Sequence, residues 1–233
     1  MAQGLEIYND NNSLLLSSDT IPILYQQKVV SRVTSNVNSK VLLSKKDGVL
    51  SVYYFDCKND VNRISDYGVF SPFGAGDNYY ILPDKMGASE HIDVEEYQFK
   101  AQIKYSCNAG LQLFNASGVE VYNSNHVPLT IVDKVSIDVS NSWYPMSTKS
   151  WGKIYTGRTK LGFLFTNIPA GITKSKTYSG VYAYDYRPYC DNDGFISITY
   201  TPTIWTYSYS SAEIPINRSL RLEFFVVDLS GLY

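Results

Sequence analysis

The sequence has little charge, few histidines and no closely spaced cysteines, and each shortage excludes a class of protein. Charged residues make up 18% of the 233 residues, and the formal net charge is −2. Lys45-Lys46 is the longest run of cations. Binding to nucleic acid by neutralising phosphates needs a basic face, which this sequence does not show. We therefore expect no nucleic-acid partner.

The chain also lacks a long apolar run, and we expect no signal peptide. Met1-Ala2-Gln3-Gly4 contains no charged segment followed by an apolar one. The longest uncharged stretch, 194–212, is rich in Tyr, Thr and Ser and alternates as strands do, so we expect no membrane insertion. The cysteines are odd in number and widely spaced, which indicates reduced thiols made in a cytoplasm, with one disulfide and a leftover thiol as the alternative; they are Cys57, Cys107 and Cys190.

Few residues are suited to catalysis or to metal binding. His91 and His126 are the only histidines, and neither has other nitrogen or sulfur ligands nearby in sequence. Asp191-Asn192-Asp193-Gly194 resembles part of a calcium loop, but a β-turn explains the same residues. Gly74-Ala75-Gly76 lacks the lysine and the helix of a phosphate loop. We predict no catalytic, metal or cofactor site; paired carboxylates remain an alternative, with candidates Asp56, Asp60, Asp185 and Asp191.

What the chain has in abundance is apolar and aromatic residues in alternating runs. Hydrophobic residues make up 44% of the sequence, and 21 residues are tyrosines. Alternation with a period of two is typical of half-buried strands. No segment shows a convincing helical stripe, and 84–97 is expected to hold at most a short turn. Strands are predicted at 49–55, 98–105, 130–139, 161–165, 195–200 and 220–227.

An internal repeat divides the chain into two halves. Gly4-Leu5-Glu6-Ile7-Tyr8-Asn9 aligns with Gly110-Leu111-Gln112-Leu113-Phe114-Asn115, and the match continues at a constant spacing through Pro22 and Pro128. Each copy reads as a β-hairpin with an Asn- or Gly-containing turn. We therefore predict an all-β protein of two tandem antiparallel β-sandwich domains related by internal duplication, 1–106 and 107–233. The longer loops of the second domain, at 141–160 and 175–194, are rich in aromatic residues.

These aromatic residues form the candidate interaction surface. Tyr and Trp give a large contact area at little entropic cost and are enriched at interfaces. Trp205, Tyr207 and Tyr209 alternate along the chain, which places them on one sheet face. Completing the core is the alternative role of these residues. The candidates are Trp143, Trp151, Tyr182, Tyr184, Tyr186, Trp205, Tyr207 and Tyr209.

The repeated motif resembles a hairpin element of tailed-bacteriophage proteins. Many short proteins encoded near tail-tip and fibre genes begin with a similar Gly-Leu-x-apolar-Phe-Asn hairpin, and the resemblance covers 4–22 and 110–128. It implies a virion protein made in the host cytoplasm, a structural component of the tail tip or fibre region that docks on other tail proteins, with a homo-oligomer expected. The alternative is a receptor-binding or lectin-like module that recognises a host surface glycan through the second domain. The motif is structural, so it assigns no catalytic residue.

Overall fold

The structure is a computed structural model. The residues that it describes are 6–8, 14–17, 23–34, 41–43, 48–56, 67–70, 79–83, 91–101, 110–118, 120–124, 126–139, 148–168, 181–205 and 221–232. Every regular element among them is a strand, so the prediction of an all-β protein is confirmed. No helix that could cross a membrane occurs within these ranges.

The strands fall into two series of equal number, one from each half of the chain. The first half provides β1 (Glu6–Tyr8), β2 (Leu14–Ser17), β3 (Ile23–Thr34), β4 (Val41–Leu43), β5 (Val49–Asp56), β6 (Tyr67–Phe70), β7 (Tyr79–Pro83) and β8 (His91–Ala101). The second half provides β9 (Gln112–Phe114), β10 (Glu120–Asn123), β11 (Thr130–Asp138), β12 (Lys149–Ile154), β13 (Leu161–Asn167), β14 (Val181–Cys190), β15 (Phe195–Trp205) and β16 (Arg221–Asp228).

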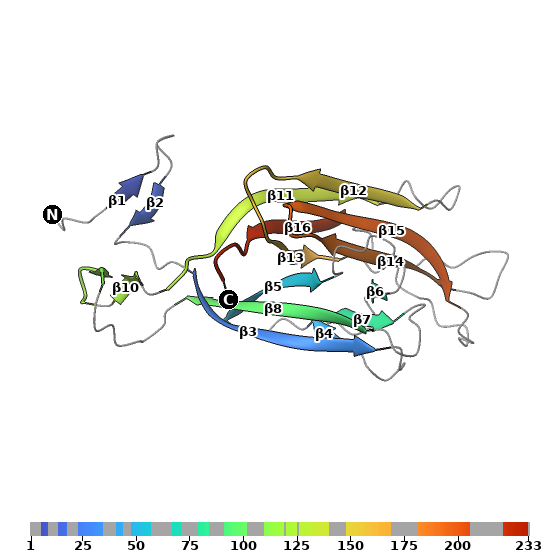
Figure 1. The fold of residues 1–233 in the computed structure, drawn as a ribbon, viewed down its shortest axis with the longest axis horizontal. Coiled ribbons are helices and arrows are strands. Elements are labelled where there is room, and N and C mark those ends of the chain that lie inside the picture. The colour runs from blue at the N-terminus through green and yellow to red at the C-terminus, as the bar shows by residue number, and fades with distance from the viewer. Residues whose placement is uncertain are drawn as a thin grey trace.

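The strands after each hairpin build two stacked layers. One layer has the order β3-β8-β5-β13-β16-β11, and the other has the order β4-β7-β6-β14-β15-β12. A single parallel pair, Cys190 with Asp56, links the two. The layers pack face to face (Figure 1). Between them, the ring of Trp151 on β12 contacts the ring of Phe224 on β16, with centroids 5.3 Å apart. This is the arrangement of a β-sandwich.

Each strand pairing within the first half has a counterpart within the second. β3-β8-β5 corresponds to β11-β16-β13, and β4-β7-β6 corresponds to β12-β15-β14. The halves join edge to edge, at Tyr53 with Phe163 in one layer and at Val69 with Tyr186 in the other. Each half therefore adds the same strands to both layers, with the order reversed about the seam between β5 and β13.

The correspondence extends to the irregularities of the sheet. β3 skips Gln26 where it pairs with β8, and β11 skips Val132 where it pairs with β16. These β-bulges are separated by the same spacing that aligns Gly4 with Gly110. A bulge leaves one residue unpaired and bends its strand, so a bulge at equivalent positions of both halves is a specific similarity between them and not a general property of sheets.

One hydrophobic core spans both halves. Buried residues of β5 and β8, such as Phe55 and Val94, belong to the same cluster as Phe163, Tyr186 and Phe224 from the second half. The rings of Phe55 and Phe163 are in contact across the seam, with centroids 6.0 Å apart. Among the described residues, the two halves therefore share one core rather than packing separately, and the domain division at 106/107 stays a prediction.

Three strands lie where loops or a turn were expected. β12 and β14 lie within the predicted loops 141–160 and 175–194, and β8 begins inside 84–97. β8 is rich in charged residues, which weaken the alternation of apolar and polar side chains on which the prediction relied. The other predicted strands are confirmed within a few residues, except that β8 ends at Ala101, before the end of the predicted strand 98–105.

Candidate interaction surfaces

The two hairpins lie at one end of the molecule, apart from the stacked layers (Figure 1). β1 pairs only with β2 and β9 only with β10 among the described residues, so each hairpin is a sheet of its own. Ile7 faces Leu16 in the first hairpin, and Leu113 faces Tyr122, the aligned residue, in the second. The register irregularity also falls at the same place in both. The two copies of the motif therefore have the same strand pairing and register.

Local hydrogen bonds fix the turn of the second hairpin. The Asn115 side-chain Oδ1 accepts from the Ser117 N–H at 3.0 Å, and the Asn115 carbonyl accepts from the Gly118 N–H at 2.9 Å. Gly118 has φ +73°, which favours glycine. At the open end, the Ser124 Oγ accepts from the Leu111 N–H at 2.9 Å. The polar residues of the motif thus specify the turn, as predicted.

The second hairpin keeps large apolar side chains in contact with solvent. Leu111 is 48% exposed and Phe114 is 50% exposed, whereas Leu113 and Val121 are buried. Val127, on the segment that follows, is 43% exposed. A two-stranded hairpin on its own is only marginally stable in water, and exposed apolar residues on it indicate a surface that contacts another molecule.

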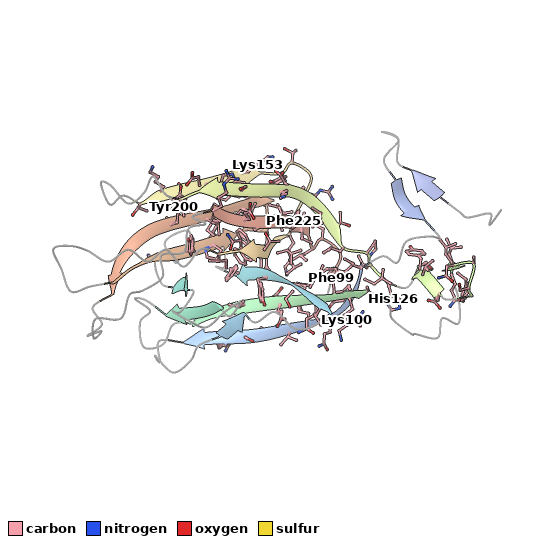
Figure 2. The ribbon with its side chains drawn as sticks, turned by 180° about the vertical axis from the view of Figure 1, so that it is seen from behind. Phe99, Lys100, His126, Lys153, Tyr200 and Phe225 are labelled. Atoms are coloured by element: carbon pink, nitrogen blue, oxygen red, sulfur yellow. The ribbon has the colours of Figure 1, made fainter. Side chains whose placement is uncertain are left out.

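The segments that follow the two hairpins are hydrogen-bonded to each other. Leu24 and Pro128 form an antiparallel bridge. The Tyr25 N–H donates to the Val127 carbonyl at 2.9 Å, and the Leu129 N–H donates to the Ile23 carbonyl at 2.8 Å. His126 lies at this junction, at the end of the sandwich beside the second hairpin (Figure 2). The start of β3 is therefore hydrogen-bonded to the segment that leads from the second hairpin into β11.

The structure places only part of the predicted aromatic surface. Tyr186 is 1% exposed and belongs to the core, so its assignment to a contact surface was wrong. Trp151 is partly buried against Phe224. The backbones of Tyr182 and Tyr184 lie in β14 and that of Trp205 ends β15, whereas Trp143, Tyr207 and Tyr209 lie outside the described residues. Of the predicted aromatic residues whose side chains are described, Tyr186 thus lies in the core and Trp151 packs against it.

A cluster of charged and aromatic residues links the two halves, and we call it the seam cluster. Lys160, on the turn before β13, donates to Glu95 Oε2 of β8 at 2.6 Å. The Tyr97 hydroxyl donates to the same oxygen at 2.5 Å, and Lys28 lies 3.7 Å from the other carboxylate oxygen. The Lys160 ammonium also lies over the Tyr54 ring, 4.3 Å from its centroid. Composition and periodicity gave no signal for this cluster, because Lys160, Lys28 and Tyr54 are distant in sequence from Glu95 and Tyr97.

The seam cluster shifts the titration of its own members. Burial alone raises the pKa of Glu95, but hydrogen bonds from Lys160 and Tyr97 and the positive charges of Lys160 and Lys28 outweigh it, and the net pKa lies below the usual value. Burial and then the hydrogen bond to Glu95 raise the pKa of the Tyr97 hydroxyl well above its usual value. At neutral pH the cluster therefore contains an ionised Glu95 and a protonated Tyr97.

Replacing Glu95 with glutamine is expected to lower the free energy of unfolding by about 2 kcal/mol at neutral pH, because hydrogen bonds to a charged acceptor become hydrogen bonds to a neutral one. The pKa of Glu95 is depressed in the folded state, so its contribution is present above the unfolded pKa and lost as the pH falls through the folded pKa. Urea unfolding of both proteins across acidic pH tests this. The stability curves should converge in acid. Asp93→Asn, which removes an ion pair to the exposed Arg32, is the control and should cost less than about 1 kcal/mol.

Equivalent positions of the two halves differ in polarity on the face between the layers. In the second half, Val226, Phe224 and Phe163 are buried. By strand pairing, their counterparts in the first half are Gln98, Glu96 and Ser51. The Glu96 Oε1 accepts from the Ser51 hydroxyl at 2.6 Å and from the Gln98 amide at 3.1 Å. The first half thus fills its interior partly with hydrogen-bonded polar groups, each with a partner.

The remaining sequence candidates have structural explanations or lie elsewhere. Asp191 Oδ1 accepts from the N–H groups of Asp193 and Phe195, both at 2.8 Å, so the residues of the calcium-like segment form a turn as expected. Cys190 is a buried thiol, and Cys57, Cys107 and Gly74-Ala75-Gly76 lie outside the described residues. No group of three His, Cys, Asp or Glu residues placed to hold a metal ion occurs in the described part of the chain.

Comparisons with family models, with curated proteins and with solved structures found no match to this chain.

Proposed function

We propose that the chain is a non-enzymatic structural component of a bacteriophage tail, at the tail tip or near the fibre, that docks on other virion proteins through its two hairpins. The observation that carries the proposal is the pair of hairpins with equivalent register at one end of the sandwich. The resemblance of their sequence to tail-associated proteins supplies the identity of the particle. The chain is then made in the host cytoplasm and incorporated into the virion.

Two physical features support docking through the hairpins. The solvent-exposed Leu111 and Phe114 lose contact with water when a partner covers them, which favours association. The outer edges of β9 and β10 pair with no further strand among the described residues, and such edges accept an added strand. Repetition of the hairpin gives two attachment points on one chain, which strengthens binding when both engage one particle.

The alternative proposal, a glycan-binding module, has lost part of its basis. Tyr186 is buried and Trp151 is partly buried against Phe224, so neither side chain is fully available to a sugar. A loss of cell binding in Trp151→Ala would therefore also follow from damage to the core. Binding of a host glycan belongs to this alternative proposal and is not part of the proposed structural function.

Replacing Phe114 with aspartate is expected to reduce incorporation of the protein into particles at least tenfold while changing the free energy of unfolding by less than about 0.5 kcal/mol, because Phe114 is exposed. The amount of protein in purified particles, measured by mass spectrometry, tests this. Ala116→Asp adds the same charge at the exposed turn of the same hairpin and is the matched control. Absence of the unmodified protein from purified particles would refute the proposed function.

A further inference from the structure

Among the described strands, β3 lies at the edge of its layer and is paired on one side only along most of its length. β3 runs from Ile23 to Thr34 and, beyond Tyr25, pairs with β8 on one side and with no other strand in the described ranges. Val29 is 37% exposed and Val30 is 54% exposed. A long edge with exposed apolar side chains is a template for pairing with another chain, which proteins otherwise suppress with charge, proline or a cover.

The second half provides an internal comparison. β11 is the counterpart of β3, and the residues equivalent to Val29 and Val30 are Val135 and Ser136. Val135 is 7% exposed, and Ser136 is a polar residue in contact with solvent. The edge of the second half is therefore covered or polar at the positions where the edge of the first half is apolar and open. The architecture does not itself require exposed valines there.

We propose that β3 pairs with β3 of a second copy of this chain, antiparallel about a two-fold axis at Val29. The chain already joins its own halves by antiparallel edge pairing, at Tyr53 with Phe163. A dimer through β3 extends the same layer by the same kind of contact. This inference goes beyond the proposed function, because neither hairpin takes part in it.

The distribution of charge selects the register and the partner. When Val30 faces Val30 of the second copy, Lys28 lies opposite Arg32, and like charges directly opposite each other are destabilising. When Val29 faces its own copy, Lys28 lies opposite Val30, and its aliphatic stem covers that side chain. Lys28 and Arg32 already have acidic partners on β8, Glu95 and Asp93, so the paired edge carries little net charge.

Two charge variants of Val29 and their mixture test the pairing. The unmodified protein should sediment with twice its mass of 26.3 kDa at micromolar concentration. Val29→Lys and Val29→Glu each place like charges opposite each other and should weaken the dimer roughly tenfold or more. Their equimolar mixture places lysine opposite glutamate and should restore a dimer with one chain of each kind. Restoration also shows that both variants fold. Ser136→Lys, on β11 at the exposed position equivalent to Val30, should leave the dimer unchanged.

Hydrogen exchange gives an independent measurement on the unmodified protein. Amides of 27–32 should become more protected as the protein concentration rises, whereas those of 130–138 should not change. The proposal is overturned if the unmodified protein is a monomer at all concentrations, if Val29→Lys dimerises as tightly as the unmodified protein, or if the mixture of variants associates no more tightly than either variant alone. A trimer or ring would equally overturn it, because a two-fold contact between identical edges closes at two chains.

Discussion

Replacing Phe224 with alanine is expected to lower the free energy of unfolding by about 4 kcal/mol, because it opens a cavity in the shared core. Phe224 is 0% exposed and contacts the rings of Trp151, Phe163 and Phe165, at 5.3, 5.1 and 6.1 Å between centroids. Urea unfolding followed by circular dichroism measures the loss. Phe225→Ala, next along β16 on the opposite face and only partly buried, is the control and should cost about half as much or less.

The same variant tests whether the halves unfold together. Because residues of β5 and β8 share the core with Phe224, its removal should reduce hydrogen-exchange protection in β8 as well as in β16. Loss of protection confined to the second half would contradict a shared core. It would instead support two independent domains divided at 106/107.

Replacing Gly194 with alanine is expected to cost about 3 kcal/mol or more, because both the backbone and the packing oppose a side chain. Gly194 has φ +80°, and a Cβ there would lie 2.7 Å from the Tyr155 carbonyl oxygen and closer still to that of Arg158. These are backbone atoms of the turn between β12 and β13, which cannot move aside as a flexible side chain can. The Gly194 carbonyl also accepts from the Tyr155 N–H at 2.9 Å.

A matched glycine separates the two effects. Gly157 also has φ +80°, but nothing lies within 4 Å of its Cβ position. Gly157→Ala should therefore cost only the backbone penalty, about 1 kcal/mol. The difference in unfolding free energy between the two variants measures the close approach of the two turns. Equal losses in both would show that the turns do not pack as described.

Electrostatic contacts connect distant elements at several places besides the seam cluster. Asp133 on β11 accepts from Lys153 and from the Tyr155 hydroxyl, both at 2.7 Å, and so ties one layer to the other. These hydrogen bonds hold the pKa of Asp133 below its usual value despite partial burial. Arg158 pairs with Asp228 and connects the turn before β13 to the last strand. Such contacts specify how elements meet more than they add to stability.

The sequence determined the class of secondary structure and the repeat. Alternating apolar residues predicted most strands, since a period of two is a local property of an extended chain. The aligned hairpins were found in sequence because a turn needs particular residues, such as Asn115 and Gly118, at fixed positions. Their equivalent register in the structure agrees with the alignment.

Only the tertiary structure decided which strands the charged segments form and where the halves meet. Glu95 and Glu96 are tolerated in β8 because Lys160 and Ser51, which come from other elements, and Tyr97 of β8 itself neutralise or hydrogen-bond them. Likewise, the sequence contained the aromatic residues but could not assign Tyr186 to the core, since burial depends on which strand lies opposite. Composition and periodicity describe each strand by itself, whereas pairing across the seam depends on residues far apart in the chain.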